Sequence, residues 1–246
     1  MVKRFEGKRV LVTGGSRGIG AAIAYLLQQE GASVAVGARH LESIDQVRKR
    51  HSHDYIAVPG NLNSPTTCHN VVNSAITQLG GLDILINNAG TVSDSKFENM
   101  QETQWHGVLR VNLDSLFHMC QQVYPDMMAQ QWGRIVNIGS MNGQAGQLNQ
   151  VNYVAAKAGM HGFTKALAQE GARYGITVNT VAPGYVDTHL MRNMPERILS
   201  KIIDKSPIHR LGTEEEVGHA VVFLVDEKSA WTTGSTVTLN GGTHMY

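Results

Sequence analysis

The sequence predicts an α/β protein built on a doubly wound parallel sheet of seven strands, with helices on both faces. Short runs rich in β-branched residues alternate with amphipathic helical stretches along the whole chain. Several of these runs are apolar on both faces, as is typical of parallel strands covered on both sides. No linker or internal repeat divides the 246 residues, so we expect a single domain over 1–246.

The predicted strands are the β-branched runs Arg9–Thr13, Ser33–Gly37, Tyr55–Pro59, Ile84–Asn87, Arg134–Gly139, Thr177–Ala182 and Thr236–Asn240. The helical stretches between them cover residues 18–30, 41–51, 65–79, 101–130, 152–174 and 214–226. Strands that alternate with helices in this way are parallel and are joined by right-handed crossovers. The pattern therefore predicts a Rossmann-type fold.

Residues 187–212 interrupt the alternation just after the sixth predicted strand. The segment contains methionines and prolines, and its only helical pattern is the short run Arg197–Asp204. Ligands of open parallel sheets bind beyond strand ends of this kind, so we interpret 187–212 as a mobile substrate lid. The alternative is an ordinary surface insertion.

Composition excludes several classes of function. The net charge is only +1, from 21 basic and 20 acidic residues, which argues against nucleic-acid or membrane-surface binding. Cys68 and Cys120 form no CxxC motif or metal-ligand spacing, so we expect no metal and two buried free thiols in a reducing compartment. No apolar run approaches the ~20 residues of a membrane span, and the N-terminus runs directly into a strand. We expect a cytoplasmic protein.

The glycine-rich turn Thr13–Gly20 joins the first strand to the first helix. Gly14, Gly18 and Gly20 permit a tight turn and a close approach of the backbone to a ligand. The helix N-terminus that follows offers free N–H groups to a pyrophosphate. After the first strand of an alternating chain, such a turn predicts a dinucleotide site.

The end of the second strand indicates which dinucleotide is bound. Chains that bind NAD place an acidic residue there to hold the ribose 2′-hydroxyl. This chain has Arg39 instead, and Arg17 of the glycine turn lies where it can assist. Guanidinium–phosphate contacts are strong, so the sequence favours NADPH. Arg39 as a merely solvated loop residue is the alternative.

Tyr153 and Lys157 are four residues apart, and therefore lie on one face of the predicted helix 152–174. An ammonium ~4 Å from a phenol favours the phenolate by roughly 4 kcal/mol at an effective dielectric constant of ~20. We therefore expect Lys157 to lower the Tyr153 pKa into the range useful for acid–base catalysis. Alone, the pair is more typical of a solvated helix surface, and the rest of the chain is needed to favour catalysis.

Other polar and glycine-containing features lie at strand ends, where open parallel sheets bind their ligands. The turn Asn87–Gly90 follows the fourth strand, Ser140 follows the fifth, and Pro183-Gly184 closes the sixth. Asn112 differs, because it lies in the middle of the predicted helix 101–130, where asparagine is a mediocre helix former.

These motifs resemble, in order and spacing, those of the short-chain dehydrogenase/reductase family, and the resemblance covers essentially the whole chain. It implies a catalytic set of Asn112, Ser140, Tyr153 and Lys157. Tyr153 would give a proton to the carbonyl oxygen, and Ser140 would stabilise the developing negative charge. Lys157 would lower the Tyr153 pKa and hold the nicotinamide ribose, while Asn112 would hold a water that links Lys157 to solvent.

The resemblance also implies a cofactor site. Asn61 departs from the family pattern, which often has an aspartate there for the adenine amino group, but an amide oxygen can still accept that bond. The implied NADP-binding residues are Gly14, Ser16, Arg17, Gly18, Ile19, Gly20, Arg39, Asn61, Leu62, Asn88, Ala89, Gly90, Tyr153, Lys157, Pro183, Gly184, Val186 and Thr188.

Within the family, the chain is most similar to the acetoacetyl-CoA reductases, and then to the 3-oxoacyl-[acyl-carrier-protein] reductases. This similarity implies NADPH-dependent formation of an (R)-3-hydroxyacyl thioester. Besides Ser140 and Tyr153, it implies that Gln147, Gln150 and Tyr185 line the substrate site. Loop or packing roles for these three remain open.

The acyl carrier is left open by the sequence. Carrier-protein reductases benefit from a basic docking patch, and the segment PDMMAQQW has no positive charge, which favours a CoA ester. Basic residues of the lid are a second place for phosphates or a carrier helix, or are simply solvated: Arg192, Arg197, Lys201, Lys205 and Arg210.

Two other functions are alternatives to thioester reduction. They are a reductase of free ketones or alcohols, and a redox sensor that binds a dinucleotide without turnover. A sensor has no need for Ser140, Tyr153 and Lys157 together. The resemblance further implies a homotetramer, with helices 101–130 and 152–174 and the last strand as interface elements, although a dimer is also compatible with the sequence.

Overall fold

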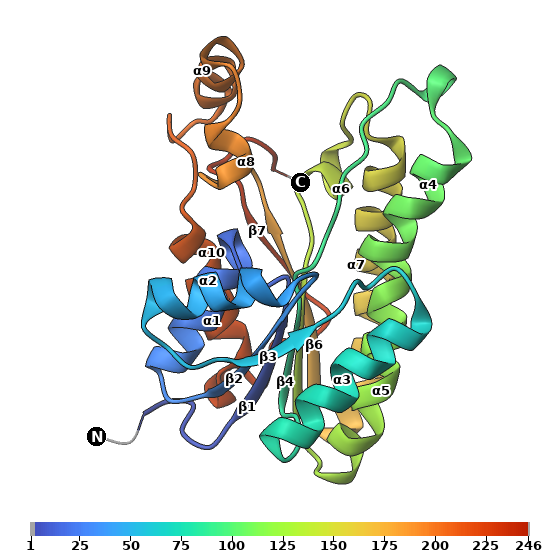
Figure 1. Cartoon of the computed structure of the whole chain (residues 1–246). Coiled ribbons are helices and arrows are strands. Elements are labelled where there is room, and N and C mark those ends of the chain that lie inside the picture. Colours follow the sequence, from blue (N-terminus) through green and yellow to red (C-terminus); the bar gives the residue numbers. More distant parts are fainter. Residues whose placement is uncertain (1–2, 246) are drawn as a thin grey trace.

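Seven parallel strands form one sheet in the order β3-β2-β1-β4-β5-β6-β7 in the computed structural model (Figure 1). The structure describes residues 3–245, the side chain at position 190 excepted. The strands are β1 (Arg9–Thr13), β2 (Ser33–Ala38), β3 (Ile56–Pro59), β4 (Ile84–Asn87), β5 (Gly133–Ile138), β6 (Ile176–Pro183) and β7 (Thr236–Leu239). The predicted fold class is confirmed, and each predicted strand matches an observed one to within one residue at either end.

Helices cover both faces of the sheet. The face formed with α1 (Gly18–Gln29) and α2 (Leu41–His51) also carries α10 (Glu214–Val225), which packs along α1. The other face carries α3 (Pro65–Leu79), α5 (Ser115–Ala129) and α7 (Val151–Gly171). Short 3₁₀ turns complete the loops at η1 (Phe97–Asn99), η3 (Ala172–Tyr174) and η4 (Glu227–Ser229).

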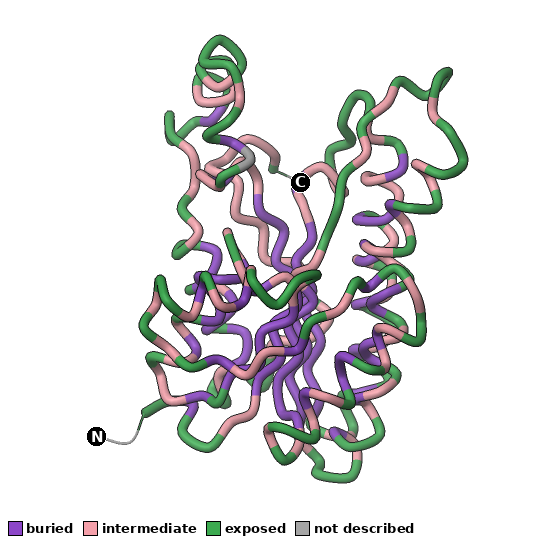
Figure 2. Tube along the Cα trace, viewed as in Figure 1, coloured by how far each residue is buried: buried purple, intermediate pink, exposed green. Residues whose placement is uncertain are grey.

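The strands carry apolar side chains on both faces because each face of the sheet has its own core. Along β1, Val10 and Val12 point into the core under α1 and α10, whereas Leu11 between them points into the core under α3 and α5. This alternation is the period of two expected of a strand. Figure 2 shows the buried segments gathered along the sheet, with exposed and half-buried arms rising above it.

The predicted helix 101–130 is present as continuous helical backbone over residues 102–129, but it contains a π turn that was not predicted. It is divided into α4 (Glu102–Leu109), a π turn η2 (Arg110–Asp114) and α5. Asn112 lies in the π turn, and its side-chain amide donates a 2.8 Å hydrogen bond to the Val108 carbonyl oxygen. A side chain that takes a backbone acceptor in this way competes with the regular helical ladder, which widens the turn.

Residues 187–212 form an arm beyond the sheet, called the lid below. The lid contains α8 (His189–Arg192) and α9 (Glu196–Lys205), so its predicted helix is present and is one residue longer at each end. Its two ends are joined by a parallel bridge between Val186 and Gly212. A second arm, which carries α4 and the short helix α6 (Asn142–Ala145), rises across from it (Figure 1).

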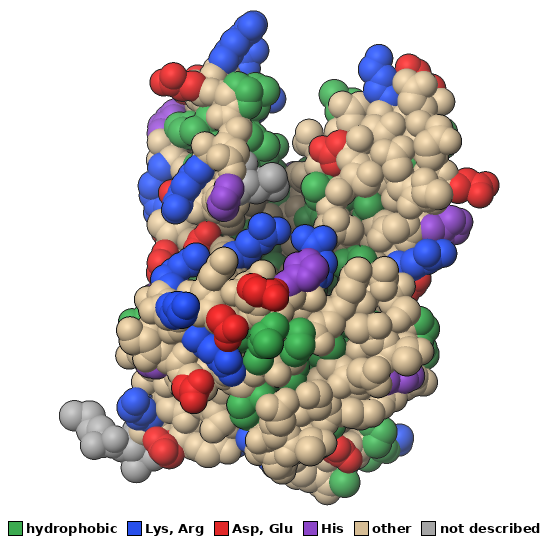
Figure 3. Space-filling model, in the orientation of Figure 1, with side chains coloured by type: hydrophobic (Ala, Val, Ile, Leu, Met, Phe, Trp, Pro, Cys, Tyr) green, Lys and Arg blue, Asp and Glu red, His purple; other side chains and the backbone are tan. Residues whose placement is uncertain are grey.

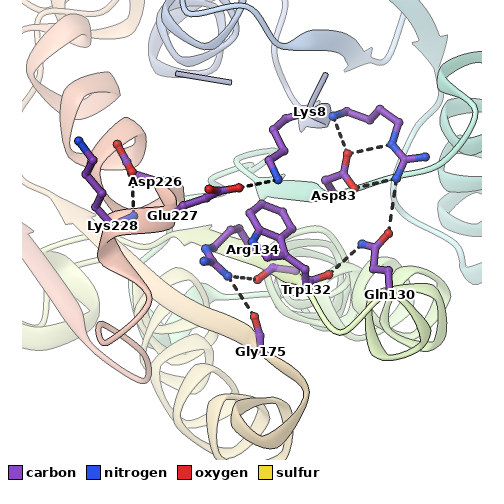
Figure 4. A network of polar contacts seen from close by, with 11 residues as sticks. Lys8, Asp83, Gln130, Trp132, Arg134, Gly175, Asp226, Glu227 and Lys228 are labelled. Carbon is purple, nitrogen blue, oxygen red and sulfur yellow. Dashed lines mark hydrogen bonds and ion pairs between the residues drawn. The ribbon is translucent and has the colours of Figure 1, made fainter. Parts of the chain in front are cut away.

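A network of charged side chains lies at the amino ends of β1, β4 and β5 (Figure 4). Arg9 forms a two-pronged ion pair with Asp83, with nitrogen–oxygen distances of 2.8 and 2.7 Å. The Trp132 ring lies between two cations, with Lys8 Nζ 3.9 Å and the Arg134 guanidinium carbon 4.4 Å from its centroid. These contacts connect residues at the starts of neighbouring strands. The cation–π contacts are stronger where the cation is desolvated, as it is for the buried Arg134.

Candidate active site

A hollow separates the two arms at the carboxyl ends of the strands (Figure 3). Lysine and arginine side chains gather at its lower rim in this view. Ligands of doubly wound sheets bind at this end of the strands. Most of the residues predicted from the sequence to form the site come from the loops around this hollow.

The glycine turn and the turn after β4 are tied into one unit. The Asn88 side-chain amide donates to the carbonyl oxygens of Thr13 and Gly14 at 2.9 and 3.0 Å. The Thr13 hydroxyl in turn accepts from the backbone N–H groups of Asn88 and Ala89 at 3.0 and 3.1 Å. A side chain at Gly20 would run into the Asn88 amide and the Gly14 carbonyl, so only glycine fits there.

The start of α1 is open for an anion. Gly14 and Gly18 have φ values of +63° and +61°, a backbone region that favours glycine. Arg17 precedes the helix in extended conformation, and no side chain caps the helix N-terminus. Free N–H groups at a helix start are an anion-binding site, and the turn that leads to them is shaped for a close backbone approach.

Arg17 and Arg39 are both exposed, and neither side chain has a hydrogen-bond or ion-pair partner within residues 3–245. Their guanidinium groups are therefore free for a phosphate. Of the predicted adenine-side residues, Asn61 is exposed, while Leu62 is buried in the core under α3. Leu62 thus attaches the loop between β3 and α3 to the core.

Lys157 lies in the centre of the candidate catalytic group. Its side chain is 3% exposed, and Nζ donates a 2.7 Å hydrogen bond to the Ile138 carbonyl oxygen. Burial lowers the pKa of Lys157 to about 8. A Cβ atom built on Gly90 would lie 3.9 Å from Lys157 Nζ and 2.9 Å from Asn112 Oδ1, so these three residues converge.

The sequence-based expectation that Lys157 lowers the Tyr153 pKa is wrong for this structure. Burial raises the pKa of Tyr153, the Ser140 hydroxyl acts to lower it, the Asp94 carboxylate raises it further, and the net direction is upward. Lys157 Nζ is 5.7 Å from the centroid of the Tyr153 ring and is directed to the Ile138 carbonyl oxygen. The two side chains share a helix face as predicted, but the ammonium is bound elsewhere.

Asn112 is fully buried and ties the π turn to the loop after β4. Its amide nitrogen donates to the Thr91 and Val108 carbonyl oxygens, each at 2.8 Å, and Oδ1 accepts from the Thr91 N–H at 3.3 Å. Both amide hydrogens are used by the protein. The remaining capacity of Oδ1 faces Gly90 beside Lys157.

The turn after β6 reaches toward both parts of the site. The Pro183 carbonyl oxygen accepts from the Met141 N–H at 2.8 Å, next to Ser140. Gly184 allows no Cβ, which would lie 2.8 Å from the Cβ of Asn240. Val186 is buried at the base of the lid, and Thr188 lies across from the glycine turn, its Cγ2 3.9 Å from a Cβ built on Gly18.

The three predicted substrate residues have different surroundings. Gln150 is held at both ends of its side chain, by the Asp94 carboxylate and the Asn142 amide. Gln147 is exposed, and its side chain has no partner in the part of the chain that the structure describes. Tyr185 is half-buried, and its carbonyl oxygen accepts from the Gly212 N–H at 3.0 Å in the lid base.

Sequence reasoning missed Asn152, which precedes Tyr153. Asn152 is fully buried, and its amide donates to the Ser93 and Gln104 carbonyl oxygens at 3.0 and 3.2 Å. Its Oδ1 accepts from the Tyr153 N–H at 2.8 Å. The residue fixes the first turn of α7 against α4 and the loop after β4, and only the unusual burial of an amide would have revealed it.

Among residues 3–245, no group of three His, Cys, Asp or Glu side chains is placed to hold a metal ion. No helix in that range is both long and apolar enough to cross a membrane. Cys68 and Cys120 are free and buried, as expected, and burial raises the pKa of both thiols.

Comparisons with known proteins agree with this geometry. The family model described as short chain dehydrogenase matches residues 8–198. The acetoacetyl-CoA reductase of Shinella zoogloeoides is 46% identical over 94% of this chain and 96% of its own. The 3-oxoacyl-[acyl-carrier-protein] reductase of Vibrio cholerae is 41% identical over 98% of both chains.

A solved structure is similar over nearly the whole length. A putative short-chain alcohol dehydrogenase from Sinorhizobium meliloti 1021 superimposes with a TM-score of 0.92 at 35% identity. The alignment covers 99% of this chain and 98% of that one. The shared fold therefore includes both arms, the lid and the arm that carries α4 and α6.

Proposed function

Because the chain belongs to the short-chain dehydrogenase family and is an oxidoreductase acting on CH–OH and C=O groups, we propose that it reduces a 3-oxoacyl thioester with NADPH. The favoured substrate is acetoacetyl-CoA, and the product is the (R)-3-hydroxyacyl thioester. The observation that carries the proposal is the convergence of Ser140, Tyr153 and Lys157 beside the open glycine turn.

The residues around the glycine turn fit a dinucleotide. The space left by Gly14 and Gly20 and the uncapped start of α1 suit a pyrophosphate. The unpartnered Arg17 and Arg39 suit the 2′-phosphate, which favours NADPH over NADH. When bound, the cofactor supplies the hydride.

Tyr153 is the proton donor of the proposed reaction. Its raised pKa keeps the phenol protonated at neutral pH, the form that can give a proton to a carbonyl oxygen. Ser140 is the second hydroxyl at this point, and it donates a hydrogen bond to the oxygen as negative charge develops. Together the two hydroxyls polarise the carbonyl.

Lys157 and Asn112 lie behind the two hydroxyls. The Lys157 ammonium, with a pKa of about 8, is charged in most molecules at neutral pH and supplies a positive potential behind Tyr153. Its hydrogens not used by Ile138 are available to a ribose hydroxyl. Asn112 Oδ1, beside Lys157, is the acceptor for a water that returns a proton to the site.

The basic residues of the lid favour coenzyme A as the acyl carrier of the thioester. Arg192 and Arg210 are neutralised by Asp187 and Glu216, at 2.9 and 2.6 Å. The other three basic residues lie on α9 at intervals of four, so they form one row along the helix, called the basic stripe below: Arg197, Lys201 and Lys205.

All three stripe residues are exposed and have no partner within the described ranges of the chain. Three unpaired cations on one helix suit the phosphates of coenzyme A. The end of α5 has no lysine or arginine with which to receive an acidic carrier protein.

We also propose a homotetramer. Phe117 on α5 is 49% exposed, and Trp231, which precedes β7, is fully exposed. Phe117 lies on a helix expected at an interface and Trp231 in the loop that leads into the last strand, and large exposed apolar groups mark association surfaces. Light scattering on the purified chain measures the mass directly; a monomer would contradict the proposal.

The function is tested by following NADPH oxidation with acetoacetyl-CoA, its carrier-protein ester and a free ketone, each repeated with NADH. Turnover is expected to be fastest with acetoacetyl-CoA and NADPH. Turnover on the free ketone alone would reject thioester reduction. Faster turnover of the carrier-protein ester would support thioester reduction but identify the acyl carrier as a carrier protein instead of coenzyme A.

A further inference from the structure

A chain of hydrogen bonds links an exposed carboxylate to the candidate catalytic serine. Gln150 Nε2 donates to both Asp94 carboxylate oxygens at 3.1 Å. Gln150 Oε1 accepts from Asn142 Nδ2 at 3.0 Å. The Asn142 backbone N–H then donates to Ser140 Oγ at 3.1 Å.

This chain connects segments that are far apart in the sequence. Asp94 lies in the loop after β4, whereas Gln150 immediately precedes α7 and Asn142 begins α6. The Ser95 N–H also donates to the Asn149 carbonyl oxygen at 2.8 Å, so the two loops are joined by backbone as well. Asn149 adopts a φ of +65°, which turns the chain so that Gln150 faces Asp94.

This series of hydrogen bonds determines the direction in which the Ser140 hydroxyl donates. Because Ser140 Oγ accepts from Asn142, its own hydrogen is left to donate into the site. The Asn142 side chain is held in turn by Gln150. Both ends of the Gln150 amide are therefore occupied by protein groups, and it is not free to bind substrate without breaking this chain.

Asp94 also brings a negative charge close to Tyr153. Its carboxylate is one of the causes that raise the Tyr153 pKa, because a phenolate beside an anion is disfavoured. The helical segments α4 and η2, which pack on α7, carry four other charged or titratable groups, namely Glu102, His106, Arg110 and Asp114. All four are exposed, and none of them shifts the Tyr153 pKa.

We propose that Asp94 is a positioning residue, which orients Ser140 through Gln150 and Asn142 and places a fixed negative charge beside Tyr153. The charge favours the proton-bearing form of Tyr153 and so favours carbonyl reduction over alcohol oxidation at neutral pH. The hydrogen bonds of Gln150 to Asp94 and Asn142 assign it to this network rather than to substrate contact. The inference rests on Tyr153 as the proton donor of the proposed function, and not on the identity of the thioester.

The charge is tested with Asp94→Asn, which keeps an acceptor for Gln150 and removes the anion. The matched control is Glu98→Gln, which removes an exposed carboxylate from the same loop. We expect the alkaline limb of kcat for reduction to move to lower pH in Asp94→Asn only. High salt is expected to move the wild-type profile the same way, because it screens exposed charges. Profiles of Asp94→Asn and wild type that superimpose at low salt would overturn this part.

The hydrogen-bond chain is tested with Gln150→Met, which has similar length and cannot make the two bonds. A positioning role predicts a kcat about tenfold lower at every pH, as for a misoriented transition-state donor, with KM unchanged. A raised KM with unchanged kcat would show that Gln150 binds substrate and would overturn the assignment. Tyr153→Phe run in parallel separates the proposals, since activity in that variant would reject the proposed chemistry itself.

Discussion

The Lys157 ammonium donates a 2.7 Å hydrogen bond to the carbonyl oxygen of Ile138, two residues before Ser140. The contact holds the lysine in a buried position at the end of β5, where no carboxylate accompanies it. Burial of an unpaired ammonium disfavours the charged form. The residue that supplies positive potential to the site therefore destabilises the fold at neutral pH.

This cost predicts a pH dependence of stability. The folded pKa of Lys157 is about 8 and the ordinary value is 10.5, so between these pH values the unfolded chain binds more protons. Stability then rises as pH increases through this window, by roughly 3 kcal/mol for this group. Urea unfolding at several pH values is expected to show the unfolding free energy of wild type rising relative to that of Lys157→Met, because the titration of the buried Cys68 and Cys120 thiols is common to both proteins. Parallel curves for the two proteins would contradict the prediction.

Removing the phenol hydroxyl tests the proton donor. Tyr153→Phe is expected to lower kcat by a factor on the order of 10³ or more, because general acid catalysis contributes ~10²–10⁴-fold. The NADPH affinity, measured by cofactor fluorescence, is expected to stay close to wild type, since the glycine turn and both free arginines are intact. Substantial turnover would exclude Tyr153 from the mechanism.

Cofactor preference is predicted to depend on Arg39. Reversing its charge in Arg39→Glu removes the guanidinium that suits a 2′-phosphate and adds repulsion. The ratio of kcat/KM for NADPH to that for NADH is expected to fall at least ~10-fold, as a charged hydrogen bond is worth about 1.5–3 kcal/mol. Lys49→Ala, an exposed cation on α2, serves as the control and should leave the ratio unchanged. An unchanged ratio in Arg39→Glu would assign the preference elsewhere.

Neutralising the basic stripe tests the acyl handle. In Arg197→Gln, Lys201→Gln and Lys205→Gln combined, KM for acetoacetyl-CoA is expected to rise about tenfold, because exposed charge contacts contribute ~0.2–1 kcal/mol each. KM for a short acetoacetyl thioester without the nucleotide should not change. Equal effects on both substrates would mean that the stripe acts through lid folding and not through phosphates.

Asn152 is predicted to be needed for stability as well as activity. Asn152→Ala leaves the Ser93 and Gln104 carbonyl groups without their donor, and the expected loss is on the order of 2–4 kcal/mol. A lower kcat is expected with it, because the turn that carries Tyr153 is less firmly held. The comparison is Gln169→Ala, an exposed position on the same helix. Unfolding curves that match this control would show that Asn152 is dispensable.

The strands and long helices were predictable because their signals are local. Runs such as Arg9–Thr13 and Ile84–Asn87 are apolar at consecutive positions, and their bounds agree with the structure. The glycine turn and the spacing of Tyr153 and Lys157 were likewise readable from the chain. Helix spacing predicted that this pair shares a face, and the structure agrees.

What the sequence could not reveal depends on contacts between distant segments. The π turn exists because Asn112 bonds to Val108 and to the loop after β4, and periodicity contains no trace of that loop. The direction of the Tyr153 pKa shift depends on burial and on where the Lys157 ammonium is bound. The link from Asp94 to Ser140 joins the loop after β4 to the connection between β5 and α7, and loop residues lack a periodic pattern.

The π turn also separates the helical segment it interrupts into two units of unequal firmness. Five apolar side chains of α5 are fixed in the core, whereas α4 buries only Val108. Segments with few buried contacts open locally at a lower free energy than the whole fold. Amide hydrogens of α4 should therefore exchange with solvent by local opening while those of α5 exchange only on global unfolding. The arm that carries α4, on one side of the candidate active site, can thus open locally while the sheet and α5 stay folded.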